Sequence, residues 1–368
     1  MISLLRNCPL PSPDISENDW NLFFNTIPPH WIGSLLLFLI HNTPDSKNVP
    51  SWVYHRLQEL FRSDHNRSLH TEVQIRSLSN ICSDAGIDFL VIKGPALGQM
   101  IYPHPAMRTG SDIDLLVAED QIPNLKSALC MHGYHIRFDS YAVSKNLFHH
   151  LIFFPDVFPS DTHRLPVEAH WRPLVLTGTG GSVTIPSLIS ESVEISTGLA
   201  TFKTLTLADA FVYAAAHMCI FHAGMLRLIW IADIAYLIRE ITRTNQWDLV
   251  IARCREWECT MACREALTQA SLWFDQAPPI PYNSSLFWPE ATENEKKVFL
   301  HLSLRKEGYE IHLHEQIQEM PTIREKCLAI YYFLARTDTI LMNVPNLSWW
   351  RYPTYWLHLV RKEFRKNR

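Results

Sequence analysis

The sequence predicts an α+β protein in which a compact block of short strands and helices lies between two helical segments. Three observations support this prediction. Apolar residues recur at helical spacing up to about residue 84, short β-rich runs alternate with turn residues up to about residue 175, and helical patterns return from Thr206 onward. We therefore expect an N-terminal helical segment (1–84), a central core of strands and helices (85–175) and a C-terminal helical region (176–368).

Length and composition agree with a globular protein. The chain has 368 residues, of which 47% are hydrophobic and 19% are charged, so it can bury a sizeable core. Its formal net charge of −4 provides no general attraction to nucleic acid or to anionic lipid. The composition therefore argues against a protein that binds either partner through overall positive charge.

The eight cysteines lack the paired spacing of zinc sites or disulfide frameworks. Even the densest set, Cys254, Cys259 and Cys263, fits neither pattern, so we expect reduced thiols and no disulfide-linked partner. The first residues also lack the apolar core and cleavage site of a secretory signal peptide. Both observations predict a cytoplasmic protein.

The helical segments contain two strongly apolar stretches, and we expect neither to cross a membrane. Trp31–Ile40 is shorter than the roughly 20 residues that a span needs. Ala210–Ile238 is long enough, but Gly224 offers a break between two helices, and the stretch contains ionisable side chains. These side chains are His217, His222, Arg227 and Asp233. Both stretches are therefore predicted to form buried helices.

The central core contains alternating predicted strands and helices. Ile87–Lys93 is a short β-rich run that ends at Gly94, and a helical stretch follows to Tyr102. Asp112–Val117 predicts the second strand, and a helix with acidic residues near its N-terminus follows it. The sequences HHLIFF and LPVEAHW are two further strand candidates, with a turn rich in proline and aspartate between them.

The second predicted strand carries two aspartates within an apolar sequence. Residues i and i+2 of a strand point to the same face, so Asp112 and Asp114 project side by side, while Ile113 and Leu115 face the other way. Two buried carboxylates so close repel each other, and a divalent cation such as Mg²⁺ or Mn²⁺ relieves this repulsion. A third carboxylate on a neighbouring strand would complete a site for two metal ions, and Glu168, in the last strand candidate, can supply it. These residues predict a metal site.

The junction between the first strand and the following helix predicts a phosphate-binding element. Gly94 lets backbone N–H groups approach an anion, the helix N-terminus favours negative charge, and Lys93 adds a point charge. Such junctions are common, but this one is followed by Arg108, by the aspartate strand and by Glu168, and that order is more specific. We expect Lys93, Gly94, Arg108 and Ser111 to contact the phosphates of a nucleotide, with the alternative that Arg108 pairs with an aspartate.

The order of these residues resembles a bacterial family named uncharacterised nucleotidyltransferases, within the DNA polymerase β superfamily. The family pattern has a Lys-Gly pair, a Tyr-Pro pair, an arginine, an Asp-Ile-Asp strand and an acidic residue before His-Trp. The matching residues here are Lys93, Gly94, Tyr102, Pro103, Arg108, Asp112, Asp114, Glu168, His170 and Trp171. The resemblance extends from about Ile87 to Leu237.

The resemblance implies a polymerase-β-like core with a mixed sheet and flanking helices, and a nucleoside triphosphate as co-substrate, with ATP as the expected nucleotide. It also implies that an acceptor oxygen attacks the α-phosphate and releases pyrophosphate. Asp112, Asp114 and Glu168 would hold the metal ions, and Glu168 or a metal-bound hydroxide would deprotonate the acceptor. The sequence departs from the wider superfamily because Lys93-Gly94 replaces the usual Gly-Ser turn, at a longer distance from the aspartates.

Four further residues are candidates for the acceptor side of the site. His170 lies in the last strand candidate, and His217, His222 and Arg227 lie in an apolar sequence where polar side chains need partners. His217 and His222 are five residues apart, which is not the i, i+4 spacing of two metal ligands on one helix face. They are acceptor contacts, base candidates or buried core histidines. Arg227 requires a partner, which is Asp233 or a phosphate.

The sequence leaves the acceptor open, and RNA, a protein hydroxyl and a small molecule all agree with these residues. Two other functions fit the same fold: a catalytically silent nucleotide-binding protein, and a helical interaction protein whose central core is only a scaffold. A loop is predicted at 178–184. The basic, aromatic stretch 352–368 predicts a docked helix with a solvated end, or a contact with nucleic acid or membrane.

Overall fold

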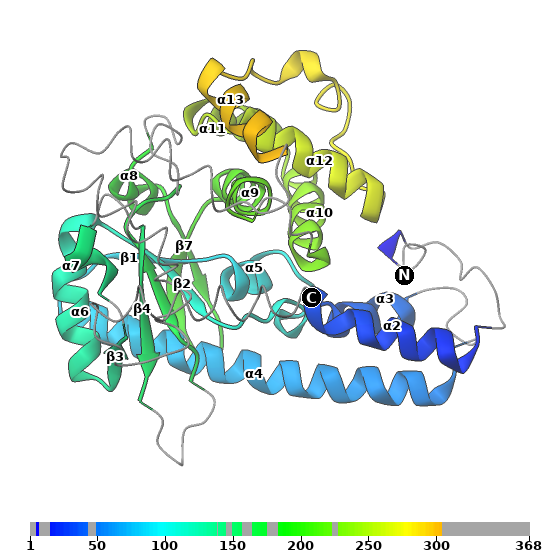
Figure 1. The fold of residues 1–368 in the computed structure, drawn as a ribbon, viewed down its shortest axis with the longest axis horizontal. Helices are drawn as coiled ribbons and strands as arrows, with labels where there is room; N and C mark the ends of the chain where they lie inside the picture. The colour runs from blue at the N-terminus through cyan, green and yellow to red at the C-terminus, as the bar shows by residue number, and fades with distance from the viewer. Residues whose placement is uncertain are drawn as a thin grey trace, which may run out of the picture.

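The computed structural model describes residues 5–6, 15–42, 49–137, 139–144, 149–156, 164–174, 183–222 and 227–303. Most of the predicted loop at 178–184 and all of the C-terminal stretch 352–368 lie outside these residues. The described chain forms a mixed sheet with helices on both sides, so the predicted α+β class is confirmed (Figure 1).

The central sheet has five strands in the order β1-β2-β5-β4-β3. The strands are β1 (Phe89–Ile92), β2 (Ile113–Val117), β3 (Tyr134–Ile136), β4 (His150–Pro155) and β5 (Val167–His170). β2 and β5 run parallel, whereas the other neighbouring strands are antiparallel. Four of these strands agree with the predicted ones to within two residues at each end, and β3 is additional.

Three described helices precede the sheet: α2 (Glu17–His30), α3 (Gly33–His41) and α4 (Ser51–Asp84). Because α4 is 34 residues long, it extends from α2 and α3 to the sheet (Figure 1). Its C-terminal half buries Ile75 and Leu78 in an apolar cluster with the strands and α6 (Ile122–Met131). The N-terminal helices and the sheet are thus joined through one continuous helix. The division into three segments stays a prediction.

Short helices connect the strands of the sheet. They are α5 (Gly94–Met100) and η2 (Pro105–Arg108) between β1 and β2, η3 (Glu119–Gln121) before α6, and α7 (Ser140–Ser144) between β3 and β4. Gly98 lets α5 and η2 approach closely, because a Cβ atom there would lie 3.2 Å from the Pro105 carbonyl oxygen. This contact places the Lys93-Gly94 junction and Arg108 beside each other.

Between Thr206 and Ser303, the described part of the C-terminal region is mainly helical, as predicted for these residues. Its helices are α8 (Ile185–Ser190), α9 (Leu207–Ala216), η4 (His217–Phe221), α10 (Leu228–Arg243), α11 (Trp247–Glu256), α12 (Thr260–Phe274), η5 (Ser285–Phe287) and α13 (Glu293–Ser303). The Thr206 side chain accepts a hydrogen bond from the Asp209 N–H and caps α9. An additional hairpin, β6 (Val193–Ser196) with β7 (Thr201–Thr204), precedes α9.

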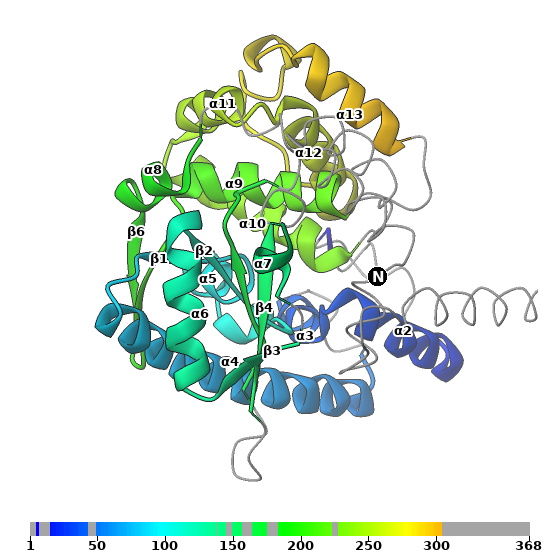
Figure 2. The same cartoon turned by 60° about the vertical axis from the view of Figure 1, so that its left-hand side comes forward.

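Alternation along the strands gives the sheet two different faces. Leu115 and Ala169 join the apolar cluster that includes α4 and α6. Leu116 joins the cluster that includes α9 and α10, and Figure 2 shows α4 and α9 on opposite sides of the strands. Asp114 shares the face of Leu116 because it lies two residues earlier in β2, and Glu168 alternates with Ala169 in the same way. The predicted carboxylates therefore face the C-terminal helices.

The described residues bear on two further predictions, the absence of a membrane span and the reduced state of the cysteines. No described helix is long and apolar enough to cross a membrane. All six cysteines in the described part of the chain are free thiols, which agrees with the predicted reduced state.

Candidate active site

Lys93, Asp114 and His170 form a buried group on three neighbouring strands. Lys93 directly follows β1, and its Nζ atom lies 2.6 Å from Asp114 Oδ1. His170 Nε2 lies 3.0 Å from the same oxygen and must donate the hydrogen bond, because an ionised carboxylate only accepts. The side chains of Lys93 and Asp114 are 13% and 6% exposed. Asp114 is thus held between a cation and an imidazole.

Two further carboxylates lie beside this group. Glu168 is directly opposite Asp114 in the parallel pairing of β2 and β5, and its Oε2 atom lies 3.7 Å from His170 Nε2. Asp112 directly precedes β2 and accepts a hydrogen bond from the Ser111 side chain. The third carboxylate therefore lies on the neighbouring strand, where the sequence predicted it.

The crowding of these carboxylates separates their acidities. Although burial opposes it, attraction to Lys93 and the hydrogen bond from His170 hold the pKa of Asp114 well below its ordinary value. Burial and then repulsion from Asp114 raise the pKa of Asp112 to about 6. Burial, Asp114 and Asp112 raise the pKa of Glu168 to about 8. The site thus combines one carboxylate whose pKa is lowered with two whose pKa values are raised, and perturbed pKa values of this kind are typical of functional sites.

The residues fit a divalent cation. One donor atom from each of Asp114, Glu168 and His170 lies within 4.8 Å of the other two. Mg²⁺ and Mn²⁺ prefer carboxylate oxygens, and Asp112 offers a further carboxylate next to this group. Lys93 supplies the positive charge that the buried Asp114 carboxylate requires. A cation held by Asp112, Asp114 and Glu168 would relieve the repulsion that raises two of the three pKa values.

The backbone of Lys93 is in an unusual conformation. Its φ of 57° and ψ of −138° lie in a region that residues other than glycine rarely occupy, at a cost of about 1–3 kcal/mol. Such a conformation persists where surrounding contacts over-determine it, and here the side chain is fixed by the ion pair with Asp114. Backbone strain of this kind clusters at functional sites.

Arg108 pairs with an aspartate, which was the alternative to a phosphate contact. Its Nε atom donates to Asp233 Oδ1 of α10 at 2.7 Å, and the Tyr102 hydroxyl donates to the same oxygen at 2.8 Å. Tyr102 and Arg108, which belong to the predicted motif, therefore anchor the central core to α10. Arg108 still lies beside the junction, because its Nη1 atom is 3.7 Å from the position of a Cβ atom on Gly94. A role in phosphate binding stays a prediction.

Arg227 does not pair with Asp233, so that part of the prediction is wrong. Asp233 is occupied by Arg108 and Tyr102. The guanidinium of Arg227 instead lies over the ring of Trp230, 4.9 Å from its centroid. The second alternative, a phosphate partner, stays open.

His217 and His222 lie together, although they are five residues apart. They are the first residue and the C-cap of η4, a π-helical turn, and their ring centroids are 4.6 Å apart. The wider π-helical turn aligns residues five apart, and single turns of this kind are frequent at functional sites. Burial and the charge of Lys93 lower the pKa of both imidazoles, to about 4 for His222. Both imidazole rings are therefore close enough to Lys93 for its charge to lower their pKa values.

Tyr213 of α9 is a candidate that the sequence reasoning missed. Its side chain is 2% exposed, and its hydroxyl has no hydrogen-bond partner within the described residues. Burial and the negative charges of Asp114 and Glu168 raise its pKa, and Lys93 opposes this shift. A tyrosine in an apolar helix carries no signal in one sequence, because only the packing of α9 on the sheet directs it toward the carboxylates.

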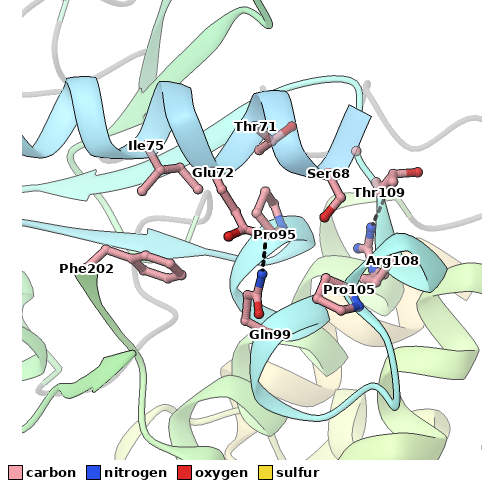
Figure 3. A pocket seen from close by; sticks show the side chains of 11 residues that line it. Ser68, Thr71, Glu72, Ile75, Pro95, Gln99, Pro105, Arg108, Thr109 and Phe202 are labelled. Atoms are coloured by element: carbon pink, nitrogen blue, oxygen red, sulfur yellow. Dashed lines mark hydrogen bonds between the residues drawn. The ribbon is translucent and has the colours of Figure 1, made fainter. Parts of the chain in front are cut away.

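A small cavity next to Arg108 is too small for a nucleotide. It measures about 10 Å³, which is room for roughly one water molecule. Figure 3 shows its wall, in which Gln99 donates to Glu72 at 2.7 Å and Arg108 donates to the Thr109 carbonyl at 3.1 Å. A larger cavity of about 440 Å³ is lined by α9, α11 and β6 residues, and no predicted site residue is in its described lining. Neither cavity contains the carboxylates.

Comparisons with known proteins place the chain in a family. A solved structure of an antigenic nucleotidyltransferase-like protein from Paracoccidioides brasiliensis is similar to this chain. The match covers 57% of this chain and 97% of that protein's chain, with 15% sequence identity and a TM-score of 0.32. No curated protein matches. A family model described as uncharacterised nucleotidyltransferase matches residues 16–275, which is more than half of the chain and includes the whole acidic site. The chain therefore belongs to this uncharacterised nucleotidyltransferase family.

Proposed function

We propose that the protein transfers a nucleoside monophosphate from a nucleoside triphosphate, with ATP as the expected donor, to an acceptor hydroxyl in a Mg²⁺- or Mn²⁺-dependent reaction. The observation that carries this proposal is the direct pairing of Asp114 with Glu168 on parallel strands, with the Lys93 ammonium 2.6 Å from Asp114. Stacking ionisable groups in a buried sheet face is costly unless a cation and phosphates use them.

Lys93, Gly94, Arg108 and Ser111 are the proposed phosphate contacts. The Lys93 side chain is charged and only 13% exposed, so it is a suitable partner for a triphosphate oxygen. When the nucleotide binds, the Lys93 ammonium leaves Asp114 and contacts a phosphate oxygen instead. Gly94 is free of side-chain bulk at this junction, and a Cβ atom there would meet its nearest neighbour at 3.7 Å.

The chemical step forms a bond between the acceptor oxygen and the α-phosphorus and breaks the bond to the bridging oxygen, so that pyrophosphate leaves. Glu168, which lies directly opposite Asp114 on the neighbouring strand, takes the proton of the acceptor hydroxyl. Asp112, Asp114 and Glu168 would hold a divalent cation, which would supply charge stabilisation during the transfer. His170 orients Asp114 through its 3.0 Å hydrogen bond.

The acceptor side is formed by the C-terminal helices in this proposal. Tyr213, His217 and His222 belong to α9 and η4, which cover the face of the sheet that carries the carboxylates. Arg227, over Trp230, is the proposed contact for a charged group of the acceptor. RNA, a protein hydroxyl and a small molecule are the acceptor classes. A cytoplasmic location agrees with the free thiols of the described residues.

The test uses the full-length protein with α-labelled nucleoside triphosphates, Mg²⁺ and a cell extract. We expect label in one acceptor fraction together with pyrophosphate release, and loss of both in Asp112→Asn. Glu194→Gln, an exposed carboxylate on β6, is the matched control and should behave like the parent. Nucleotide binding without pyrophosphate release would indicate a silent nucleotide-binding protein. The absence of any Mg²⁺-dependent nucleotide binding would indicate a helical interaction protein.

A further inference from the structure

Three histidines gather at the end of β4 and β5, beside the carboxylates. His149 directly precedes β4, His150 is the first residue of β4, and His170 is the last residue of β5. The antiparallel register places His150 directly opposite His170. The ring centroids are 4.4 Å apart for His149 and His150, 5.7 Å for His149 and His170, and 5.3 Å for His150 and His170.

The nitrogen atoms of these rings are spaced like the ligands of one metal ion. One nitrogen from each histidine lies within 4.8 Å of the other two, and His149 Nε2 is 2.9 Å from His150 Nδ1. Two imidazole nitrogens bound to a tetrahedral zinc ion at about 2.0–2.1 Å are about 3.3 Å apart. The 2.9 Å separation of the His149 and His150 nitrogens is close to this value, and the His170 nitrogen lies within 4.8 Å of both.

The third histidine also has the outer partner that metal-binding imidazoles use. His170 donates its Nε2–H to Asp114 Oδ1 at 3.0 Å, which leaves the lone pair on Nδ1. A carboxylate that accepts the other N–H of a ligand imidazole fixes its tautomer and raises its basicity. His149 and His150 are only partly buried, so an ion from solution can reach the group.

We propose that His149, His150 and His170 form a binding site for a divalent transition-metal ion of the Zn²⁺, Co²⁺ or Ni²⁺ class. Imidazole nitrogens select these ions, whereas Mg²⁺ prefers oxygen ligands, so the site differs in selectivity from the one that the carboxylates offer. Three protein ligands leave a fourth coordination position open, as in zinc sites that bind a water or a substrate group. The histidine site does not depend on nucleotide transfer by the protein.

In the test, the full-length protein is titrated with Co²⁺, and the visible absorption bands of tetrahedral Co²⁺ are measured. A large excess of Mg²⁺ is present so that it occupies the carboxylates. We expect one ion per chain, with an affinity that Mg²⁺ does not change. His149→Ala should weaken binding at least about tenfold, the lower limit seen even when an outer partner is removed. His135→Ala is the matched control, because His135 lies on β3 and bonds to Asp156 at 2.8 Å. It should bind Co²⁺ like the parent.

Two results would overturn the proposal. One is the lack of a stoichiometric Co²⁺ complex in the parent protein. The other is a complex that excess Mg²⁺ displaces and that His149→Ala leaves intact, which would place the ion on the carboxylates. His149 is partly exposed, so this variant is expected to fold, and its melting curve checks that. Asp112→Asn should keep the Co²⁺ complex while losing transfer, which separates this proposal from the proposed function.

Discussion

Replacing Glu168 with glutamine should stabilise the metal-free protein at alkaline pH. The structure places this carboxylate opposite Asp114 on the neighbouring strand, with 23% of its side chain exposed. Burial, Asp114 and Asp112 raise its pKa from 4.5 to about 8. A shift of this size corresponds to at most about 5 kcal/mol, at about 1.4 kcal/mol for each pH unit. The glutamine side chain would keep the shape of the glutamate without its charge.

The sign of the effect follows from proton linkage. The folded protein binds the Glu168 proton more tightly than the unfolded chain does, so the parent is relatively stabilised at low pH. That stabilisation is lost as the pH rises from about 4.5 through about 8. We therefore expect parent and Glu168→Gln to have similar free energies of unfolding near pH 4.5, and the variant to be more stable by up to about 5 kcal/mol near pH 9.

Urea unfolding followed by circular dichroism in EDTA, from pH 4.5 to 9, measures this difference. Glu194→Gln on β6 is the control, because Glu194 is exposed and distant in the sequence from the site. Adding Mg²⁺ should stabilise the parent and not Glu168→Gln. A variant that is less stable than the parent at pH 9, or a difference that does not change with pH, would refute the electrostatic reasoning. Glu168 would then be a structural hydrogen-bonding residue.

Three further predictions concern neighbouring residues. Asp114→Asn should destabilise the metal-free protein by about 3–5 kcal/mol in urea unfolding, because it leaves the Lys93 ammonium without its partner. Asp112→Asn should be as stable as the parent or more stable, because it removes the repulsion between Asp112 and Asp114. Tyr213→Phe should keep or slightly raise the melting temperature, because the hydroxyl has no partner in the described chain, while nucleotide transfer falls. A lower melting temperature would contradict this. His222→Ala should reduce transfer up to about a hundredfold at unchanged Mg²⁺-nucleotide affinity in calorimetry, and normal turnover per folded molecule would remove His222 from the acceptor side.

Much of the central core could be predicted from the sequence because it depends on local patterns. Four of the five strands of the central sheet have β-rich runs bounded by turn residues. Thr206 is the N-cap of α9, which begins at the next residue. The missed elements carry weak signals of this kind. β3 has three residues, and the strands of the β6–β7 hairpin are short and mostly exposed. A short exposed strand is stabilised by its neighbour more than by its own sequence.

The carboxylates of the site were also visible in the sequence, as residue types that an apolar strand does not normally contain. The sequence predicted Glu168 on a neighbouring strand, but it could not show the register that sets Glu168 directly opposite Asp114. That depends on the parallel pairing of β2 with β5, which brings Glu168 opposite Asp114 across more than fifty residues of chain. Pairing at this distance is decided by the whole sheet, since each strand could satisfy its hydrogen bonds with several partners.

The sequence by itself thus determined the α+β class, the acidic residues and the phosphate-binding candidates, because these follow from local periodicity and from the chemistry of side chains. Only the tertiary structure decided which charges meet. It paired Arg108 with Asp233, turned η4 into a π-helix that joins His217 and His222, and directed Tyr213 toward the carboxylates. These contacts join residues that are distant in the chain or depend on one irregular turn. Buried polar groups take whichever partners the packing brings within reach, and the packing depends on the whole chain.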